Sequence, residues 1–423
     1  MKKIKVLFFY PNEFLGPEMT VYAQIIRHLG RDRFAPHLVV NSRANGILRL
    51  SEEEGVTVRR WDFGLALRGS LRAALGATLG LPTSMISLIR YAIKENIDVV
   101  QCSAVARTGA LGLMLARLTC ARLLLHYHVV PGRFAGKRGF FERAAALHAD
   151  RAVAVSSFLA EQVLRSGVSA NRIDVVRNGV DLRRFRPDND GSAMRQEYGL
   201  APGAPLVLQL GRIHQGKRQE DLVRAFAIAR RRVLGLRCLL VGWEDDRYNG
   251  SYSNYTAELR HICEQENLGD SLIIGTARPE AAELMAAADI VAMPSLDEGF
   301  CLVVAEAMAT GKPVIGADSG GITELISDGV TGFLVPPKSP EVLSEKIVLL
   351  AESADLRAKM GQSARRRAET VLGEERLAAE FAPIYEALTG HAAPIGLGRT
   401  DCGDPGGRPD GYNERSMPWR PKR

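Results

Sequence analysis

The most informative part of the chain reads PSLDEGFCLVVAEAMATGKPV (residues 294–314) and follows the apolar run ADIVAM. An apolar run, a short polar stretch and an alanine-rich apolar stretch predict a strand, a turn and a helix over about residues 301–310. Glu298 lies in the turn, and Glu306 lies two helical turns later, roughly 12 Å away by helix rise. The two carboxylates are too far apart to bind one group, so we expect them to bind opposite ends of one long ligand.

Backbone amides at the start of this predicted helix suit an anion. Their N–H groups lack partners within the helix, and the positive end of the helix dipole adds to them, so together they favour a diphosphate. They belong to Gly299, Phe300, Cys301 and Leu302. Carboxylates suit the hydroxyls of a sugar or ribose, which donate hydrogen bonds. In the alternative reading, Glu298 is an ordinary helix-start charge and Glu306 faces solvent.

Short apolar runs alternate with amphipathic helical patterns along the whole chain. This alternation is typical of βα units around parallel sheets, so we predict the α/β class. In the first half, the predicted strands are residues 5–9, 37–41, 57–61, 99–102, 123–128, 152–155 and 173–176. In the second half, they are residues 206–210, 237–241, 271–274, 290–293, 313–316 and 332–335.

The two series are separated by RPDNDGSAMRQEYGLAPGAP (residues 186–205), a polar stretch with the composition of a linker. We therefore predict one Rossmann-like domain over residues 1–187 and a second over residues 188–370. Helical patterns end near residue 388. Residues 391–423 are rich in Gly, Pro and Arg, and we expect them to be a disordered tail.

Composition narrows the function further. The chain is 46% hydrophobic and 24% charged, which is typical of a globular protein. Its cysteines lack the spacing of a metal site or a disulfide framework, which favours a reducing cytosol. The apolar run at residues 6–9 is too short for a signal peptide, and no stretch of 18 apolar residues exists, so we predict no membrane span.

Positive charge is concentrated in the first half of the chain, while the net charge is +7. This bias either indicates an anionic partner or reflects solvated helix faces. Residues 65–91 combine apolar and basic side chains with no acidic ones. They form either an amphipathic surface that touches anionic lipid or two ordinary helices around Pro82. No motif or interleaved aromatic pattern supports a nucleic-acid partner.

Together with residues 294–314, three further segments resemble the motifs of family-4 retaining glycosyltransferases, which have the GT-B fold of two facing Rossmann-like domains. The first stretch resembles that family's Glu-x7-Glu signature. The others are VSSFLAEQVLRSGVSANRIDVVRNGVDLRRF (residues 155–185), LVLQLGRIHQGKRQEDLVRAFA (residues 206–227) and SGGITELISDGVTGFLVPP (residues 319–337). The likeness covers about residues 1–390, and several motifs in one order are more specific than any one of them.

The resemblance implies roles for the domains and for individual residues. Residues 1–187 would bind the acceptor, residues 188–370 would bind a nucleoside-diphosphate-sugar donor, and a helix over 371–390 would pack back on the first domain. Arg212 and Lys217 follow a predicted strand and would neutralise the departing diphosphate. The backbone amide of Gly16, in the loop after the first strand, would approach the donor phosphate.

Three residues stand where the family usually has glycine: Leu15, Arg218 and Cys301. Arg218 adds charge to the loop that holds Lys217. The side chain of Cys301 would narrow the donor site. A helix N-terminus would lower the pKa of this thiol, but no base lies near it in the sequence, so we do not expect a nucleophile.

Two histidines end the predicted strand at residues 123–128. His128 matches the family's strand-end histidine, which lines the reaction centre, so His128 and Glu298 are the implied catalytic residues. His126 would point to the same face of the sheet but deeper, because side chains alternate along a strand. For His126, a structural role is the better expectation.

The implied reaction transfers a sugar with retention of anomeric configuration. We predict no metal and no cofactor beyond the nucleotide-sugar co-substrate, because cations of the protein replace a metal and the pair Asp245–Asp246 reads as solvent-facing. The expected acceptor is a glycan or lipid-linked molecule of cell-envelope or exopolysaccharide synthesis. The expected location is the cytoplasm, with contact to the inner face of the membrane.

Two other functions were weighed. An NAD-dependent dehydrogenase needs G-x-G-x-x-G after its first strand, and neither half supplies it, since residues 107–112 hold only two glycines. A non-catalytic GT-B-like binding or assembly subunit is the remaining alternative. The aromatic stretch over residues 243–259 either shapes the ligand pocket or forms a surface loop.

Overall fold

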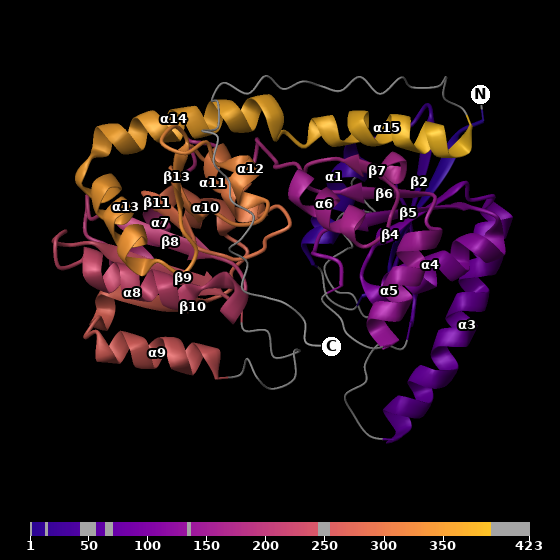
Figure 1. The fold of residues 1–423 in the computed structure, drawn as a ribbon, viewed down its shortest axis with the longest axis horizontal. Helices are drawn as coiled ribbons and strands as arrows, with labels where there is room; N and C mark the ends of the chain where they lie inside the picture. The colour runs from indigo at the N-terminus through magenta and orange to yellow at the C-terminus, as the bar shows by residue number, and fades with distance from the viewer. Residues whose placement is uncertain are drawn as a thin grey trace.

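The computed structural model of the chain describes residues 2–12, 16–42, 56–63, 71–132, 137–243 and 254–390. It contains two parallel β-sheets, each covered by helices on both faces, side by side in Figure 1. The predicted α/β class with two Rossmann-like sheets is confirmed. Every predicted strand is present, with ends that differ by at most a few residues.

The first sheet has seven parallel strands in the order β3-β2-β1-β4-β5-β6-β7. Its central strand β1 is almost wholly buried, as expected of a parallel strand covered on both faces. The strand order reverses between β1 and β4, so a crevice opens at their C-terminal ends. The strands are β1 (Ile4–Tyr10), β2 (Phe34–Asn41), β3 (Thr57–Trp61), β4 (Val99–Ser103), β5 (Arg122–Tyr127), β6 (Arg151–Ala154) and β7 (Ile173–Val175).

Two helical layers cover this sheet. One face packs against α1 (Pro17–His28) and the C-terminal helix α15 (Glu375–Thr389), whose Phe381 and Tyr385 share a core with strand residues. The other face packs against four helices. These are α3 (Leu71–Glu95), α4 (Ala106–Thr119), α5 (Lys137–His148) and α6 (Ser157–Arg165).

The second sheet has six parallel strands in the order β10-β9-β8-β11-β12-β13, and its order reverses between β8 and β11. Alternate residues of a strand face opposite cores: Leu206 and Leu208 face one helical layer, and Val207 faces the other. The strands are β8 (Leu206–Leu210), β9 (Arg237–Gly242), β10 (Leu272–Thr276), β11 (Ile290–Met293), β12 (Val314–Ala317) and β13 (Gly332–Val335).

The helices around the second sheet form two layers. On one face lie α7 (Ser192–Glu197), α10 (Ala281–Ala287), α11 (Leu302–Ala309), α12 (Ile322–Leu325) and α14 (Ala354–Val371). On the other lie α8 (Gln219–Ala229), α9 (Tyr255–Gln265) and α13 (Pro340–Glu352). The core on the α11 face also contains Val155 and Leu159, from the end of the first sheet. The two halves therefore share apolar contacts.

Helix α15 follows α14 of the second half and returns to the first half, so that α14 and α15 line one side of the molecule (Figure 1). Glu374, just before α15, is buried, and its carboxylate accepts hydrogen bonds from Arg27 (2.7 Å) and pairs with His28 (3.0 Å) at the end of α1. These contacts anchor the returning chain.

One local expectation was wrong, and the helix expected over about residues 301–310 is present with its start one residue later. One of the two expectations for residues 65–91 was a pair of helices around Pro82. Residues 71–95 instead form one continuous helix that contains Pro82. Proline removes one helical hydrogen bond and usually ends or kinks a helix, yet this helix continues through Pro82. The helix after Glu298 begins at Leu302, because Cys301 adopts a left-handed backbone (φ 71°). Leu15, Asp245–Asp246 and the tail over 391–423 lie outside the described residues.

Candidate functional site

The predicted site residues come from loops at the C-terminal ends of strands that flank the two order reversals. Arg212 and Lys217 follow β8, Glu298 follows β11, Gly16 follows β1, and His128 follows β5. In doubly wound sheets this edge is where ligands bind. The two halves meet here, since a Cβ placed on Gly299 would lie only 2.3 Å from the backbone oxygen of His128.

Lys217 and Glu298 form a largely buried ion pair, with 15% and 17% of their side chains exposed. Burial opposes the charge of each group, but their mutual attraction is stronger. The pKa of Lys217 is therefore raised, and the pKa of Glu298 is lowered, with Arg212 adding to the second effect. Both groups are charged at neutral pH, so the pair is a fixed dipole at the edge of the sheet.

The loop that carries Lys217 is rigid. Residues 215–217 form a 3-10 turn, in which the His214 ring nitrogen Nδ1 accepts a hydrogen bond from the Gly216 amide (3.0 Å). The side chain of Gln209 donates to the carbonyl of Lys217 (2.9 Å). The lysine is thus held by the strand that precedes it.

Arg218 explains how this loop accommodates a residue other than glycine. Its φ of 52° lies in the left-handed region that favours glycine. Its guanidinium donates two hydrogen bonds to Asp221 (2.8 and 2.7 Å) and pairs with Glu220, both in the first turn of α8. The charge of Arg218 is therefore neutralised by the carboxylates of Glu220 and Asp221 in α8.

Glu306 lies in α11 among buried alanines, as the sequence indicates. Burial raises the pKa of Glu306 to about 7, although Arg184 acts in the opposite direction. This carboxyl is therefore about half protonated at neutral pH. A ligand whose hydroxyls donate to the ionised form would lower its pKa again.

Cys301 caps α11, and its thiol is buried. Burial raises the pKa of Cys301 to about 12, and the charge of Glu298 acts in the same direction. The expected lowering by the helix N-terminus was therefore wrong, because burial outweighs it. No described residue accepts a hydrogen bond from the amides at the start of this helix. These are the amides of Gly299, Phe300, Cys301 and Leu302.

On the first half, the amide of Gly16 donates to the Tyr10 hydroxyl (2.8 Å). The carboxylate of Glu18 bends back toward it, with one oxygen 2.5 Å from the position of a Cβ on Gly16. Burial raises the pKa of Glu18, while the charge of Arg212 across the cleft opposes that rise. Glu18 was missed from the sequence, where it reads only as an acidic residue in a first helical turn.

His126 and His128 share one face of β5, as predicted, and their ring centroids are 4.1 Å apart. Burial lowers the pKa of His128 to about 3 and that of His126 well below its usual value. Both rings are therefore neutral. Nδ1 of His126 pairs with the Gln101 side-chain amide (3.3 Å), and Gln101 in turn accepts from the Tyr385 hydroxyl (2.5 Å).

Glu324 links the two halves beside this cleft. It belongs to α12, and its two carboxylate oxygens accept from the Phe158 amide (2.8 Å) and from Arg177 (3.1 Å) of the first half. The carbonyl of Glu324 also accepts from Arg367 of α14. The late Gly-Gly…Glu segment thus helps to hold the halves together.

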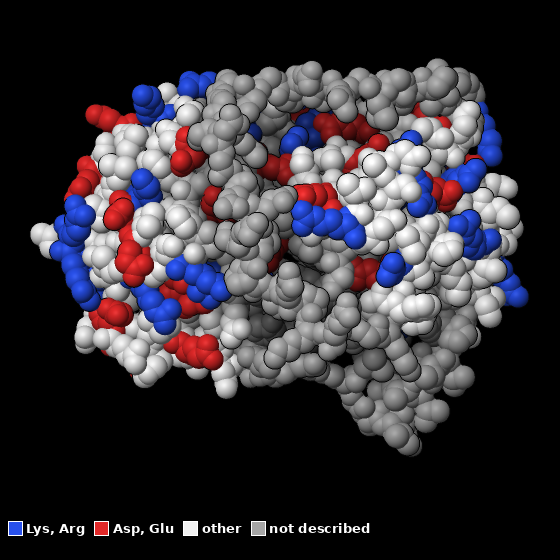
Figure 2. Space-filling view, viewed as in Figure 1, with Lys and Arg blue, Asp and Glu red and all other residues white. Residues whose placement is uncertain are grey.

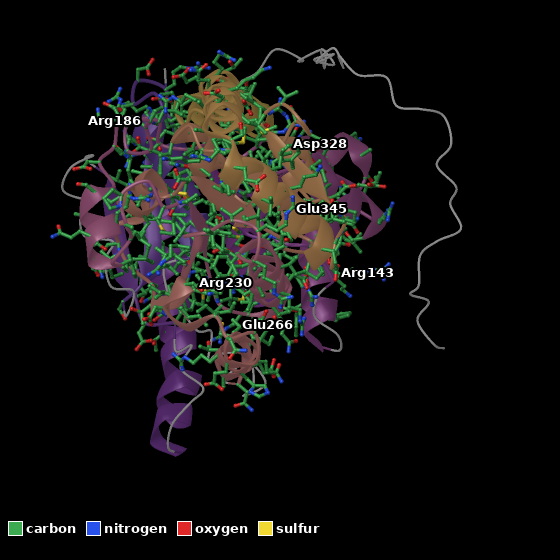
Figure 3. The ribbon with its side chains drawn as sticks, turned by 90° about the vertical axis from the view of Figure 1, so that its left-hand side faces the viewer. Arg143, Arg186, Arg230, Glu266, Asp328 and Glu345 are labelled. Carbon is green, nitrogen blue, oxygen red and sulfur yellow. The ribbon has the colours of Figure 1, made fainter. Side chains whose placement is uncertain are left out.

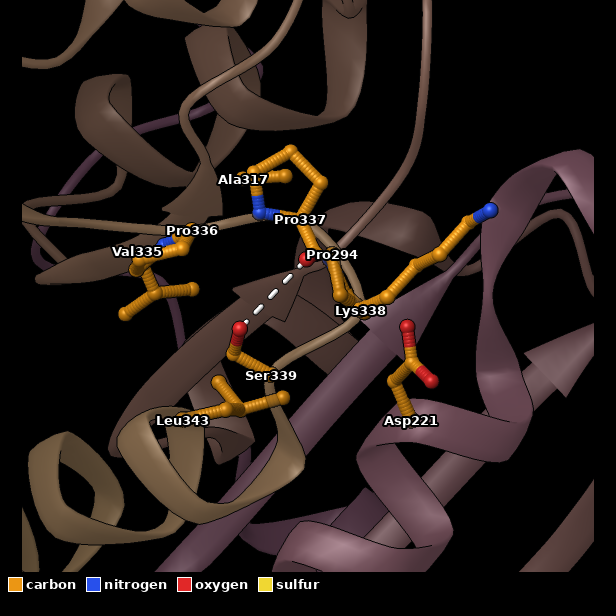
Figure 4. A pocket seen from close by; sticks show the side chains of 9 residues that line it. All are labelled: Asp221, Pro294, Ala317, Val335, Pro336, Pro337, Lys338, Ser339 and Leu343. Atoms are coloured by element: carbon orange, nitrogen blue, oxygen red, sulfur yellow. Dashed lines mark hydrogen bonds between the residues drawn. The ribbon is translucent and has the colours of Figure 1, made fainter. Parts of the chain in front are cut away.

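A small pocket lies next to these loops but contains none of the predicted site residues (Figure 4). Asp221, Lys338 and Ser339 line it together with apolar and proline residues after β11, β12 and β13. Among the described residues, no cluster of His, Cys, Asp or Glu could hold a metal ion. Within the same residues, no helix is both long and apolar enough to cross a membrane.

Comparison with protein families matches both halves of the chain. The family described as "Glycosyltransferase Family 4" matches residues 19–184, and the family described as "Glycosyl transferases group 1" matches residues 190–367. These matches cover the loops that carry His128, Lys217 and Glu298.

Relatives and solved structures agree with this result. A D-inositol 3-phosphate glycosyltransferase of Nocardia farcinica is 37% identical over 225 residues, 52% of this chain and 49% of the relative. One from Pseudarthrobacter chlorophenolicus is 34% identical over 268 residues, 62% of this chain and 61% of the relative. The chain spans about half the length of the curated relatives that it matches.

The fold is GT-B. Anabaena Alr3699/HepE in complex with UDP-glucose superposes with a TM-score of 0.76 at 23% identity, covering 91% of this chain and all of that one. Sucrose-phosphate synthase of Thermosynechococcus elongatus superposes with a TM-score of 0.75 at 22% identity, covering 92% of this chain and all of that one.

Proposed function

Since the chain belongs to the family-4 glycosyltransferases, we propose that it transfers a sugar from a nucleoside diphosphate sugar to an acceptor hydroxyl, with retention of anomeric configuration. The observation that carries this proposal is the buried pair of Lys217 and Glu298 beside the N-terminus of α11. A fixed cation and unpartnered amides at one place suit a diphosphate.

Departure of the diphosphate builds negative charge on its oxygens. Lys217 and Arg212 stabilise that charge, together with the amides at the start of α11, and Glu298 holds Lys217 in place. These groups supply the role that a metal ion has in other transferases, so the reaction is metal-independent. Glu306, about two helical turns from Glu298, binds the ribose hydroxyls.

The acceptor hydroxyl approaches from the first half. His128 lines its path and is uncharged, since burial lowers the pKa of His128 to about 3, so it acts as a hydrogen-bonding group and not as a charged acid. The backbone of Gly299 lies close enough to the His128 carbonyl that a Cβ on Gly299 would be only 2.3 Å from it, so the donor loop and the acceptor side approach each other closely here.

The donor in this proposal is a UDP-sugar, because the structural neighbour from Anabaena is described in complex with UDP and with UDP-glucose. The acceptor is a glycan or lipid-linked molecule of cell-envelope or exopolysaccharide synthesis, and the protein works in the cytoplasm at the inner face of the membrane. The mixture of exposed apolar and basic side chains on the first half supports the membrane location.

A polyol phosphate is a second candidate acceptor, since the relatives are named D-inositol 3-phosphate glycosyltransferases. Arg107 favours it. This half-buried residue lies in the first turn of α4, beside the end of β4; burial lowers its pKa, and its guanidinium donates to the Phe63 carbonyl (3.3 Å). A phosphate would compensate this buried charge.

The first test is a thermal-shift screen of UDP-, GDP- and ADP-sugars. A ligand that binds only the folded protein raises its melting temperature. We expect one nucleotide to raise it in the wild type and not in Lys217→Ala or Glu306→Ala, whereas the exposed-site control Lys359→Ala keeps the shift. Donor binding without any sugar transfer would instead favour the non-catalytic binding subunit.

A second test concerns the chemistry. Proton NMR of the glycoside formed from an α-linked donor should give the α-linked product at early time points. Activity should survive EDTA. A β-linked product would refute retention, and activity lost in EDTA and restored by Mg²⁺ or Mn²⁺ would refute metal independence.

A further inference from the structure

The helical layer formed by α3, α4, α5 and α6 exposes large apolar side chains to an unusual extent. Phe140 and Phe141, at the start of α5, are 70% and 51% exposed. Ile86 and Ile93 of α3 and Met114 and Leu118 of α4 are also exposed. Single exposed apolar residues are ordinary, but several on one layer mark a contact surface.

The same layer carries cations and almost no exposed acids. Arg90 of α3, Arg117 of α4 and Arg143 of α5 are exposed, and Arg143 lies at the surface in Figure 3. In Figure 2 the described surface of the first half is mostly white, with blue patches of Lys and Arg and fewer red ones of Asp and Glu. The layer therefore combines apolar side chains with positive charge.

The acidic residues of these helices do not offset that charge. Glu142 of α5 is buried, and its carboxylate accepts from the Gly132 amide (3.2 Å). Glu95 pairs with Lys5 (3.8 Å) beneath the layer, and Glu161 of α6 pairs with Arg165 within its own helix. The described outer face thus has a net positive charge.

We infer that this layer docks on the surface of an anionic lipid bilayer, with the two phenylalanines inserted at the headgroup boundary. Aromatic and aliphatic side chains are stabilised when they leave water, and neighbouring Arg side chains are attracted to anionic lipid head groups. This combination fits the membrane–water interface better than a protein core. The inference rests on the proposed function, because it assigns the acceptor to the membrane.

The position of α5 connects this surface to the site. The chain runs from His128, at the end of β5, through residues 129–136 into α5. The amide of Gly132, four residues after His128, donates to Glu142 of α5 (3.2 Å), so a bilayer at the start of α5 lies near the loop that follows His128. A lipid-linked acceptor could present its head group to His128 while its tail stays in the membrane.

The test is co-sedimentation of the purified full chain with vesicles of phosphatidylcholine alone or with 30% phosphatidylglycerol, a mixture we choose to mimic an anionic surface. We expect binding to the anionic vesicles that weakens at high salt, because charge attraction is screened. Phe140→Ser/Phe141→Ser and Arg143→Glu should each weaken binding, about tenfold or more for the charge reversal.

Leu234→Ser is the matched control, because Leu234 is 92% exposed on the second half. It should bind vesicles like the wild type. Wild-type protein that ignores anionic vesicles, or both surface variants binding as well as the wild type, would overturn the inference. The rise in melting temperature with the donor, measured without lipid, should be the same in these variants as in the wild type. If the donor produces no such rise in the wild type, the result counts against the proposed function alone.

Discussion

The imidazole rings of His126 and His128 lie 4.1 Å apart on one face of β5, and burial keeps both neutral. His126 is held by Gln101, and Gln101 is held by Tyr385 of α15. With Gln101 accepting from Tyr385, its amide donates to Nδ1 of His126, so the remaining proton of that ring is on Nε2, toward the cleft side. The orientation of His126 is therefore fixed by α15, which packs on the same face of the sheet as this histidine.

Tyr385→Phe should lower both stability and transfer. It leaves a buried acceptor on Gln101 without a partner, which should cost about 1–3 kcal/mol of unfolding free energy. Because Gln101 then releases His126, the turnover rate should fall, while KM for the donor stays unchanged. Urea unfolding and steady-state kinetics measure the two effects.

Tyr91→Phe is the matched control for this change. Tyr91 shares a hydrogen bond with His37 (2.6 Å) in the same half of the protein, away from the cleft edge. It should lose a similar amount of stability and keep its turnover rate. Equal losses of turnover in the two variants would mean that Tyr385 matters only for folding.

Lys217→Met should abolish donor binding and destabilise the protein by about 2–4 kcal/mol, because it leaves Glu298 buried and uncompensated. The double variant Lys217→Met/Glu298→Gln should recover much of that stability, since no unpaired charge remains. It should not recover transfer, which should stay at least about a hundredfold below wild type. Recovery of transfer in the double variant would contradict the role given to Lys217.

Glu306 should make stability depend on pH. Its pKa is about 7 in the folded protein and 4.5 in the reference state, so its contribution is fully present below pH 4.5 and is lost as pH rises through 7. Glu306→Gln should therefore match the wild type near pH 5 and be up to about 3 kcal/mol more stable at pH 8. Urea unfolding at the two pH values measures the difference.

The same variant should bind the donor less well. An amide replaces one acceptor oxygen by a donor, so two ribose hydroxyls can no longer both donate to residue 306. The thermal shift with the nucleotide sugar should shrink even at pH 8, where the empty variant is the more stable protein. A variant that gains stability and keeps its full shift would show that Glu306 does not touch the ligand.

Gly299→Ala should separate donor binding from transfer. The added methyl group would lie 2.3 Å from the His128 carbonyl and 2.9 Å from Leu159, so the cleft could not close as it does here. Donor thermal shifts should persist, because the charged groups that bind the donor, Arg212, Lys217 and Glu306, belong to the second half and stay in place. Turnover should fall about tenfold or more, since a small misplacement of reacting groups is costly. Gly275→Ala, whose Cβ would meet the Tyr198 hydroxyl at 3.3 Å and Val241 at 3.6 Å, with no backbone atom among its nearest contacts, should retain turnover.

Strands and the large loops of the site were predictable because their signals are local. The all-buried β1 and the alternation of Leu206, Val207 and Leu208 follow from apolar patterns within single strands. The resemblance placed Lys217 and Glu298 in one site, but their ion pair was not predicted, since the two residues are 81 positions apart in the chain.

What the sequence did not predict depends on contacts between distant segments. Glu18 acquires its raised pKa from burial, which exceeds the opposing effects of Arg212 and Ser103 from distant segments, and Gln101 acquires its partner from α15. The apolar pattern of the predicted helix includes Cys301, but this residue adopts a left-handed backbone. The backbone of Gly320 and Gly321 holds the loop around Glu298 and so determines where the helix begins. No single-segment pattern contains that information.

Helix α15 has a consequence for how the protein is made. The first sheet is synthesised early, yet part of its core, including Phe381 and Tyr385, emerges from the ribosome only after the whole second half. Until then α1 alone covers that face of the sheet, and the apolar surface that α15 will bury is exposed to premature association. The nascent first half must therefore wait for its last helix, and its maturation is coupled to completion of the chain.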